Sequence, residues 1–124
     1  MEQTTLAKVV AFLRAHPETY LATVSGDAPW VRAMHAARVE EDGTVWYATA
    51  RSTSKVAQLA QNPKVSLAVY ADGQHARVFG TAVVIDDTQA KHDLWEEDWR
   101  VYFAGKDDPH YVLIKVTPGR VELT

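Results

Sequence analysis

The stretch that decides the fold is residues 30–49, which read WVRAMHAARVEEDGTVWYAT. Residues 30–39 alternate in character and are rich in side chains that favour extended backbone, so they are predicted to form a long β-strand. The Asp42-Gly43 pair then supplies turn chemistry, and residues 45–49 form a second β-rich run. This pattern predicts a β-hairpin.

Outward from the hairpin, turn residues separate further β-rich runs from segments with helical periodicity. Further strands are predicted at residues 20–24, 65–70, 75–85, 111–116 and 120–123, the last two separated by a turn at Pro118-Gly119. Helices are predicted at residues 4–15, 52–61 and 88–103. Short turns between consecutive strands favour a mainly antiparallel sheet, and short strands in a chain of 124 residues usually curl into a barrel. We therefore expect one domain over residues 1–124, mainly β with flanking helices.

Composition excludes several classes of function. The sequence has no cysteine, which excludes disulfides, thiolate nucleophiles and cysteine-ligated metal sites. A formal net charge of -3 gives no general basic footprint for nucleic acid. The spacing of the five histidines is not that of a metal site. No apolar run is long enough to span a membrane and no signal peptide is recognised, so a cytoplasmic location is expected.

Two arginines stand out in the first strand of the hairpin. Strict alternation over residues 30–39 places Arg32, Met34 and Arg38 on one face, together with Trp30 and Ala36. An unpaired buried charge destabilises a protein by several kcal/mol, and the cost is roughly 3–5 kcal/mol when one partner of a buried ion pair is removed. This face is therefore either solvated or holds an anion, and both interpretations remain open at this point.

A second cluster of polar side chains lies at residues 49–55, between the end of a predicted strand and the start of a predicted helix. It combines hydroxyls with Arg51 and Lys55. Free backbone N–H groups at a helix N-terminus favour a bound anion, and Lys55 adds a mobile positive charge. Ordinary helix capping by Ser52 or Thr53 explains the hydroxyls equally well, and the two roles are compatible.

Five blocks of the sequence, taken in order and spacing, resemble the FMN-binding split-barrel family of pyridoxamine 5′-phosphate oxidase-like proteins, closest to the general stress protein type. The blocks are residues 29–34, 42–49, 54–59, 62–67 and 105–111. The resemblance implies an antiparallel, Greek-key split β-barrel, a homodimer with flavin sites at its interface, and FMN as the cofactor.

The resemblance also implies which residues hold the flavin. The matching positions are Arg32, Ala33, Met34, His35, Ala48, Thr49, Ser54 and Lys55. The hydroxyl of Thr53, beside Ser54 at the start of the predicted helix, is expected to donate a further hydrogen bond to the phosphate. Many relatives have arginine at the position of Ser54, so the phosphate here is expected to rely on Arg32 and Lys55, with Arg51 as a further candidate. A contact from the partner subunit is expected near Gln74 or His75.

The predicted helix at residues 88–103 carries Lys91, Trp95, Trp99 and Phe103 at four-residue spacing. Packing against the barrel or against a partner subunit explains the aromatic side chains without a ligand. The alternative is that Trp95 or Trp99 lines the flavin pocket of the neighbouring chain, and Trp99 is included among the expected cofactor contacts.

The resemblance implies an FMN-dependent oxidoreductase acting on a small-molecule or electron-transfer substrate, with no catalytic residue identified. The oxidase's N-terminal segment and C-terminal Arg-x-His motif are not found, so true pyridoxamine 5′-phosphate oxidase activity is not expected. One alternative is a non-catalytic flavin-binding module of a stress response. Another is the same barrel binding F420 or haem, the latter ligated by His35, His75 or His110.

Overall fold

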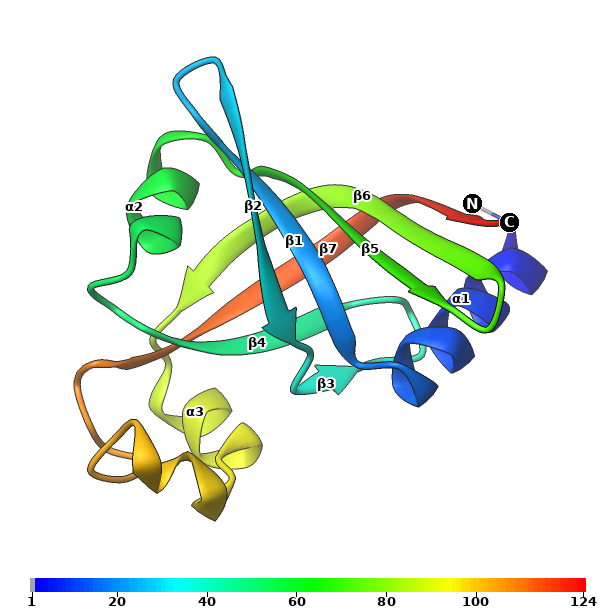
Figure 1. The fold of residues 1–124 in the computed structure, drawn as a ribbon. Helices are drawn as coiled ribbons and strands as arrows, with labels where there is room; N and C mark the ends of the chain where they lie inside the picture. The colour runs from blue at the N-terminus through cyan, green and yellow to red at the C-terminus, as the bar shows by residue number, and fades with distance from the viewer. Residues whose placement is uncertain (1) are drawn as a thin grey trace.

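The computed structural model describes residues 2–124, and over this range seven strands form one mainly antiparallel, strongly curved sheet (Figure 1). The strands are β1 (Glu18–Ser25), β2 (Ala28–His35), β3 (Arg38–Val39), β4 (Val45–Ala50), β5 (Lys64–Ala71), β6 (Gln74–Ile85) and β7 (Tyr111–Leu123). The helices are α1 (Gln3–Ala15), α2 (Ser54–Gln61), α3 (Thr88–Leu94) and the 3-10 helix η1 (Glu97–Val101).

The strand order β2-β1-β5-β6-β7-β4-β3 confirms the predicted split barrel. Neighbours β1/β5 and β4/β7 are far apart in the sequence, as Greek-key connections require. The hairpins follow the turn chemistry: Asp72 and Gly73, between β5 and β6, both have positive φ, which suits a tight turn between twisted strands.

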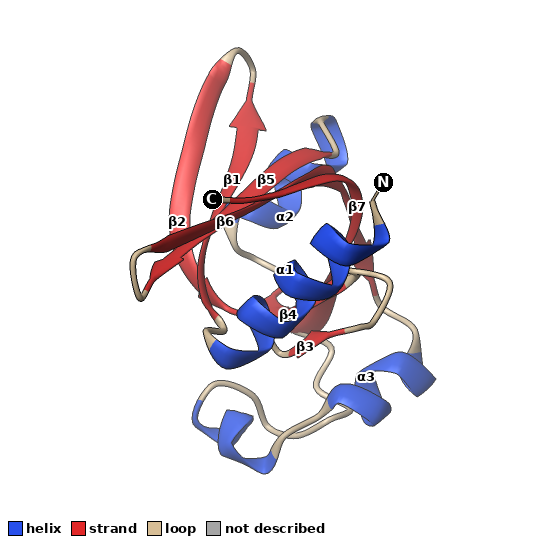
Figure 2. Ribbon diagram, turned by 90° about the vertical axis from the view of Figure 1, so that its right-hand side faces the viewer, coloured by secondary structure: helices blue, strands red, loops and turns tan. Residues whose placement is uncertain are grey.

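Helix α1 covers one open end of the barrel (Figure 2). Its apolar side chains recur every three or four residues, so they fall on one stripe, and Val9 and Leu13 are almost completely buried in the main core. Arg14 ties the helix to β3, because its Nε donates a hydrogen bond to the carbonyl of Val39 at 2.8 Å.

The strand predicted at residues 30–39 is two strands, which corrects the sequence-based assignment. At the junction, Ala36 N–H donates to Pro17 O at 2.8 Å and Ala37 N–H donates to Trp46 O at 2.7 Å. The backbone thus changes partner from the β1 side to the β4 side as it crosses between the two outer strands. The alternation of side chains is lost at this point, and Arg38 is exposed on a different face from Arg32.

The C-terminal strand is continuous, and the turn predicted at Pro118-Gly119 is a β-bulge instead. Phe79 pairs with Arg120 and Gly80 pairs with Pro118, which leaves Gly119 as an extra residue on β7. A side chain at Gly80 would place its Cβ 2.0 Å from the carbonyl oxygen of Thr117, so this close backbone approach requires glycine. The bulge bends the strand without ending it.

The long helix predicted at residues 88–103 is also wrong. It divides into α3 and η1 because Trp95 and Glu96 adopt extended backbone, with ψ of 136° and 135°. The break lets the Trp95 ring pack edge-on against Tyr111, 5.3 Å between centroids, while Trp99 packs on the same tyrosine at 5.9 Å. Aromatic packing has overridden the helical pattern, and the α3–η1 segment forms a small lobe beside the barrel (Figure 1).

Asp86 fixes this lobe to the barrel and carries the first testable prediction. Its carboxylate accepts hydrogen bonds from Lys91, at 2.9 Å, and from Arg51, and the two lower its pKa in that order. We expect Asp86→Asn to reduce the free energy of unfolding by about 1–2 kcal/mol at pH 7, a loss moderated by solvent because the carboxylate is half exposed.

The pH dependence of that loss follows from the lowered pKa. The contribution of Asp86 is present above the unfolded-state pKa of about 3.9 and disappears as the pH falls through the lower folded-state value. Urea titrations at pH 7 and near pH 2 measure the difference, with Glu41→Gln, at an exposed turn position, as the control. A loss that is equal at both pH values would argue against the ion pair.

Candidate functional site

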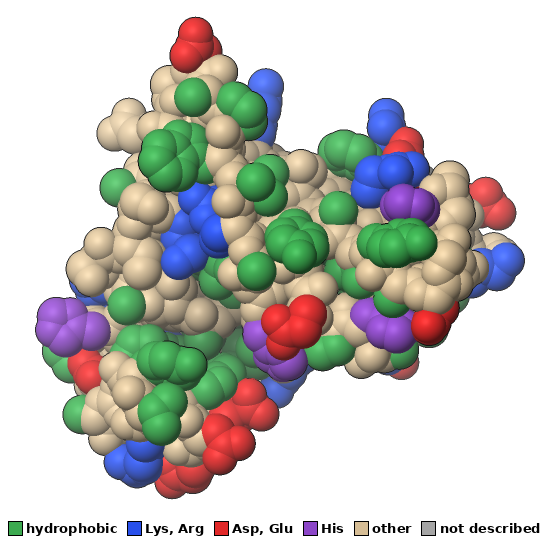
Figure 3. All heavy atoms as spheres, in the orientation of Figure 1, with side chains coloured by type: hydrophobic (Ala, Val, Ile, Leu, Met, Phe, Trp, Pro, Cys, Tyr) green, Lys and Arg blue, Asp and Glu red, His purple; other side chains and the backbone are tan. Residues whose placement is uncertain are grey.

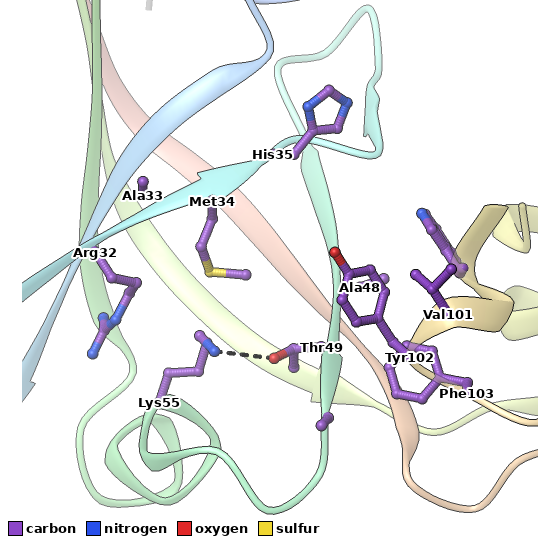
Figure 4. A pocket seen from close by; sticks show the side chains of 12 residues that line it. Arg32, Ala33, Met34, His35, Ala48, Thr49, Lys55, Val101, Tyr102 and Phe103 are labelled. Carbon is purple, nitrogen blue, oxygen red and sulfur yellow. Dashed lines mark hydrogen bonds between the residues drawn. The ribbon is translucent and has the colours of Figure 1, made fainter.

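A cavity of about 730 Å³ lies where β2, the end of β4, the start of α2 and the η1 segment meet (Figure 4). Its lining residues come from segments that are far apart in the sequence. They are Arg32, Ala33, Met34, His35, Ala48, Thr49, Ala50, Lys55, Trp99, Val101, Tyr102 and Phe103. The volume is typical of a site for a cofactor or a drug-sized ligand, about 300–1,000 Å³.

One end of the cavity is cationic. Arg32 points inward from β2, and Lys55 extends from the first turn of α2 to donate a hydrogen bond to Thr49 Oγ1 at 3.1 Å (Figure 4). Burial lowers the pKa of Lys55 and the charge of Arg32 lowers it further. Within residues 2–124 neither cation forms a salt bridge with a carboxylate, so this end of the cavity presents two uncompensated positive charges.

Arg32 is half-buried and held in place from behind. Its Nη1 donates to Thr23 Oγ1 at 2.8 Å, and its Nη2 donates to Gln58 Oε1 at 2.9 Å. Removal from water lowers the pKa of the guanidinium. The charge remains, since an arginine in a protein is effectively always protonated. The geometry therefore presents a fixed cation to the cavity.

The other walls are apolar and aromatic. Met34 and Ala48 line the cavity from two different strands, and Phe103 faces them from the lobe (Figure 4). The half-buried Trp99 of the same lobe also lines the cavity. Tyr102 lies at the rim with 78% of its surface exposed. A cavity that is cationic at one end and lined mainly by apolar and aromatic side chains elsewhere suits an aromatic molecule that carries an anionic group.

Comparison with known proteins agrees with this geometry. The family model for "Pyridoxamine 5'-phosphate oxidase like" proteins matches residues 4–123. The chain belongs to this family.

General stress protein 26 of Bacillus subtilis is 29% identical over 122 residues, which cover 94% of this chain and 85% of that protein. The crystal structure of General Stress Protein 26 from Bacillus anthracis superposes with a TM-score of 0.82 at 26% identity, covering 95% of this chain and 92% of that one. The general stress FMN/FAD binding protein of Xanthomonas citri shares the fold, with a TM-score of 0.84 at 20% identity and coverage of 99% and 89%.

Eight of the eleven residues predicted to contact the cofactor line the cavity of this oxidase-like chain. They are Arg32, Ala33, Met34, His35, Ala48, Thr49, Lys55 and Trp99. Trp99 lines the cavity of its own chain, whereas the sequence predicts a contact with the pocket of the neighbouring chain.

Thr53 and Ser54 do not line the cavity. Thr53 is the residue before α2, but its hydroxyl donates back to Ala50 O at 2.9 Å and does not cap the helix. Ser54 is exposed. Arg51, the further candidate for the phosphate, is engaged with Asp86 and with the carbonyl of Pro109. Direct contact of Thr53 or Ser54 with a cofactor stays a prediction.

The histidines are spread over the surface. His35 borders the cavity from the outward face of β2 and pairs with Glu18 on β1. His75 is the second residue of β6, and its ring packs on Tyr70 with centroids 4.6 Å apart. Neither His75 nor His110 lines the cavity. In the described range no group of three or more His, Cys, Asp or Glu residues is arranged to hold a metal ion.

Sequence reasoning missed two kinds of site residue. The rim formed by Val101, Tyr102 and Phe103 depends on the break in the predicted helix, and no glycine or proline in the segment indicates that break. Thr23 and Gln58 had a detectable signal, because each is a polar residue at a position where the strand or helix periodicity points inward.

None of the helices over residues 2–124 is long and apolar enough to cross a membrane.

Proposed function

We propose that the cavity binds FMN, with the phosphate against Arg32 and Lys55 and the ring system along β2 toward the aromatic wall. The observation that carries the proposal is the pair of uncompensated cations at one end of an otherwise apolar cavity. The family membership and the fold shared with an FMN/FAD binding protein support a flavin over other planar anions.

The residues present are sufficient to hold such a group. A charge-assisted hydrogen bond contributes about 1.5–3 kcal/mol, and micromolar binding requires about 8 kcal/mol. Bonds from Arg32 and Lys55 supply a large part of this, and burial of the ring against Met34 and Ala48 supplies more. When bound, the flavin would provide the hydride or electron chemistry, and the protein would bind, orient and shield it.

We further propose that the protein is a flavin-dependent oxidoreductase that acts on a small-molecule or electron-transfer substrate. Trp99 and Phe103 keep water from one side of the cavity, while the exposed rim at Tyr102 leaves an approach for a second molecule. A non-catalytic flavin-binding module predicts a different result in one assay. Steady-state turnover with reduced nicotinamides and common electron acceptors supports the oxidoreductase, and bound flavin without turnover supports the module.

The cofactor itself is tested by adding FMN, FAD or riboflavin to the apoprotein and measuring the quenching of flavin fluorescence. We expect FMN to bind most tightly. Chromatography of the cofactor released from a yellow preparation identifies it independently. Preferential binding of F420 or haem would overturn the proposal, although of the three histidines considered for haem only His35 reaches the cavity.

A homodimer completes the proposed site. The outward-facing side chains of β1, β2 and β5 include the large exposed residues Tyr20, Val31 and Tyr70, and hydrophobic side chains gather over β1 and β2 in Figure 3. The hollow that holds lysine and arginine side chains, between β2 and α2, opens on the same face (Figure 3). We propose that a second copy covers this face and forms the missing wall, and His75 is well placed for the predicted partner contact because it pairs with Tyr70.

The lowered pKa of Lys55 leads to a prediction for the pH dependence of FMN binding. A bound phosphate stabilises the charged ammonium and raises this pKa again. FMN affinity should therefore be constant near neutral pH and should fall as the pH rises through the lowered value, below the ordinary 10.5 for lysine. Lys55→Arg, whose charge persists at alkaline pH, should remove this fall, and isothermal titration at several pH values checks it. Parallel profiles for the two proteins would contradict the assignment.

A further inference from the structure

Arg32, at the cationic end of the cavity, forms a closed ring of hydrogen bonds with Thr23 and Gln58. Arg32 donates to Thr23 Oγ1 and to Gln58 Oε1, and the Thr23 hydroxyl donates to the same Gln58 oxygen at 2.5 Å. Thr23 and Gln58 are buried, with exposed fractions of 1% and 8%. The guanidinium is therefore held at two of its nitrogens by groups that water does not reach freely.

The orientation of the Gln58 amide follows from its neighbours. A guanidinium can only donate hydrogen bonds, so the Gln58 atom that faces Arg32 must be the carbonyl oxygen. With that oxygen accepting from both Arg32 and Thr23, the threonine hydroxyl can accept from Arg32 and donate to Gln58 at once. Each of the three hydrogen bonds in the ring therefore has one donor and one acceptor, with no two donors or two acceptors facing each other.

The chemistry of the acceptor is the important feature. Buried arginines in proteins are ordinarily paired with carboxylates, which cancel their charge. Here the acceptor is a neutral amide, which gives the same geometry without the negative charge. The full positive charge of Arg32 thus remains available to a ligand in the cavity.

We propose that Gln58 is a positioning residue that holds Arg32 while leaving it charged, and that the site thereby selects a phosphorylated flavin over the same flavin without its phosphate. This inference rests on the proposed binding of FMN. Gln58 does not line the cavity, so it acts through Arg32 and not by contact with the ligand.

Gln58→Glu tests the inference with a nearly isosteric change. Glutamate keeps both accepted hydrogen bonds, and Arg32 at 2.9 Å keeps the new carboxylate ionised, so a salt bridge replaces the neutral contact. We expect the dissociation constant for FMN to rise at least about tenfold and that for riboflavin to change less than about threefold. The control is Gln61→Glu, the same change at an exposed position on the same helix, which should alter neither value appreciably.

The outcomes separate the inference from the proposed function. If the unmodified protein binds neither flavin, the proposed function fails, and the inference fails with it. If the unmodified protein binds FMN but Gln58→Glu retains its preference for FMN over riboflavin, only the inference is overturned. Equal losses for the two flavins would also overturn it, because they would indicate general distortion of the site. Circular dichroism and a thermal unfolding curve establish that each variant is folded.

Thr23 provides a second measurement. Thr23→Val removes the hydroxyl from the ring with little change in volume, whereas Thr23→Ser retains it. We expect the valine variant to lose FMN affinity by about threefold to tenfold and the serine variant to remain close to the unmodified protein. A valine variant that is folded and retains full preference for FMN would show that the ring does not position Arg32.

Discussion

Replacing Lys55 with alanine is expected to weaken FMN binding at least about tenfold, and up to about a hundredfold. Lys55 reaches the cavity from the first turn of α2, and its Nζ donates to the Thr49 hydroxyl. Among the described residues 2–124 it forms no salt bridge with a carboxylate. One charge-assisted hydrogen bond to a phosphate is worth about 1.5–3 kcal/mol, and each 1.4 kcal/mol corresponds to a factor of ten. Titration of the apoprotein with FMN, followed by flavin fluorescence, measures the change.

The control for this variant is Lys64→Ala, which removes the same charge at an exposed position on β5. It should leave FMN affinity within about twofold, since charges that are separated by more than a Debye length of about 8 Å are largely screened at physiological salt. The dependence on salt provides a further check, because loss of a phosphate contact should flatten it. Unchanged FMN affinity in Lys55→Ala would contradict the proposal that the phosphate binds at this end of the cavity.

The barrel was predictable because its determinants are local. Turn residues such as Asp72-Gly73 separate runs whose alternation is visible in the sequence, and the β5–β6 hairpin lies where it was predicted. The family resemblance supplied the Greek-key split-barrel topology, which local patterns do not specify. The bulge at Gly119 was read as a turn because a Pro-Gly pair is typical of turns, whereas the close approach of Gly80 to β7 appears only after folding.

The lobe could not be predicted from periodicity. Residues 88–103 contain no helix-breaking glycine or proline, and the break at Trp95 arises from the contacts of its ring with Tyr111, about 16 positions further along. Those contacts are tertiary, so a pattern confined to one segment carries no information about them. The aromatic rim of the cavity was missed for the same reason.

The residues of the site also differ in whether local sequence patterns could predict them. Arg32 and Lys55 were predicted because unpaired charge among apolar or hydroxyl-bearing neighbours is conspicuous in a sequence. Their support was not, since the ring that holds Arg32 joins residues 9 and 26 positions away from it. Arg38 shows the opposite error: strict alternation assigned it to the same face as Arg32, but the crossover at Ala36 and Ala37 turns it away.

Val31→Asp is expected to convert a dimer into a monomer. Val31 is 67% exposed and lies on the outward face of β2, opposite Ala22 on β1. In a two-fold interface the same surface is used by both subunits, so one substitution introduces two carboxylates. Removing one partner of a buried ion pair, which leaves the other charge unpaired, costs roughly 3–5 kcal/mol. A cost of this size corresponds to association that is at least about a hundredfold weaker. Light scattering at several protein concentrations measures the mass.

The matched control is Val83→Asp, the same change at another exposed valine of the same sheet. Val83 lies on β6 opposite Lys115, outside the proposed interface, and is 51% exposed. The control should remain dimeric. A dimeric Val31→Asp variant, or an unmodified protein that is monomeric with FMN bound, would contradict the proposed interface.

The flavin affinity of the Val31→Asp monomer decides how much of the site one chain contains. The cavity has its cations and its aromatic wall within a single chain, and the hollow with its lysine and arginine side chains opens at the surface (Figure 3). A ring that is exposed on one side loses part of the apolar burial, at about 25 cal/mol per Å², while the phosphate contacts persist. We therefore expect the monomer to bind FMN about tenfold more weakly and to bind inorganic phosphate as before. If FMN affinity is fully retained, the second subunit is not a wall of the site, and the apolar face of β1, β2 and β5 serves assembly alone.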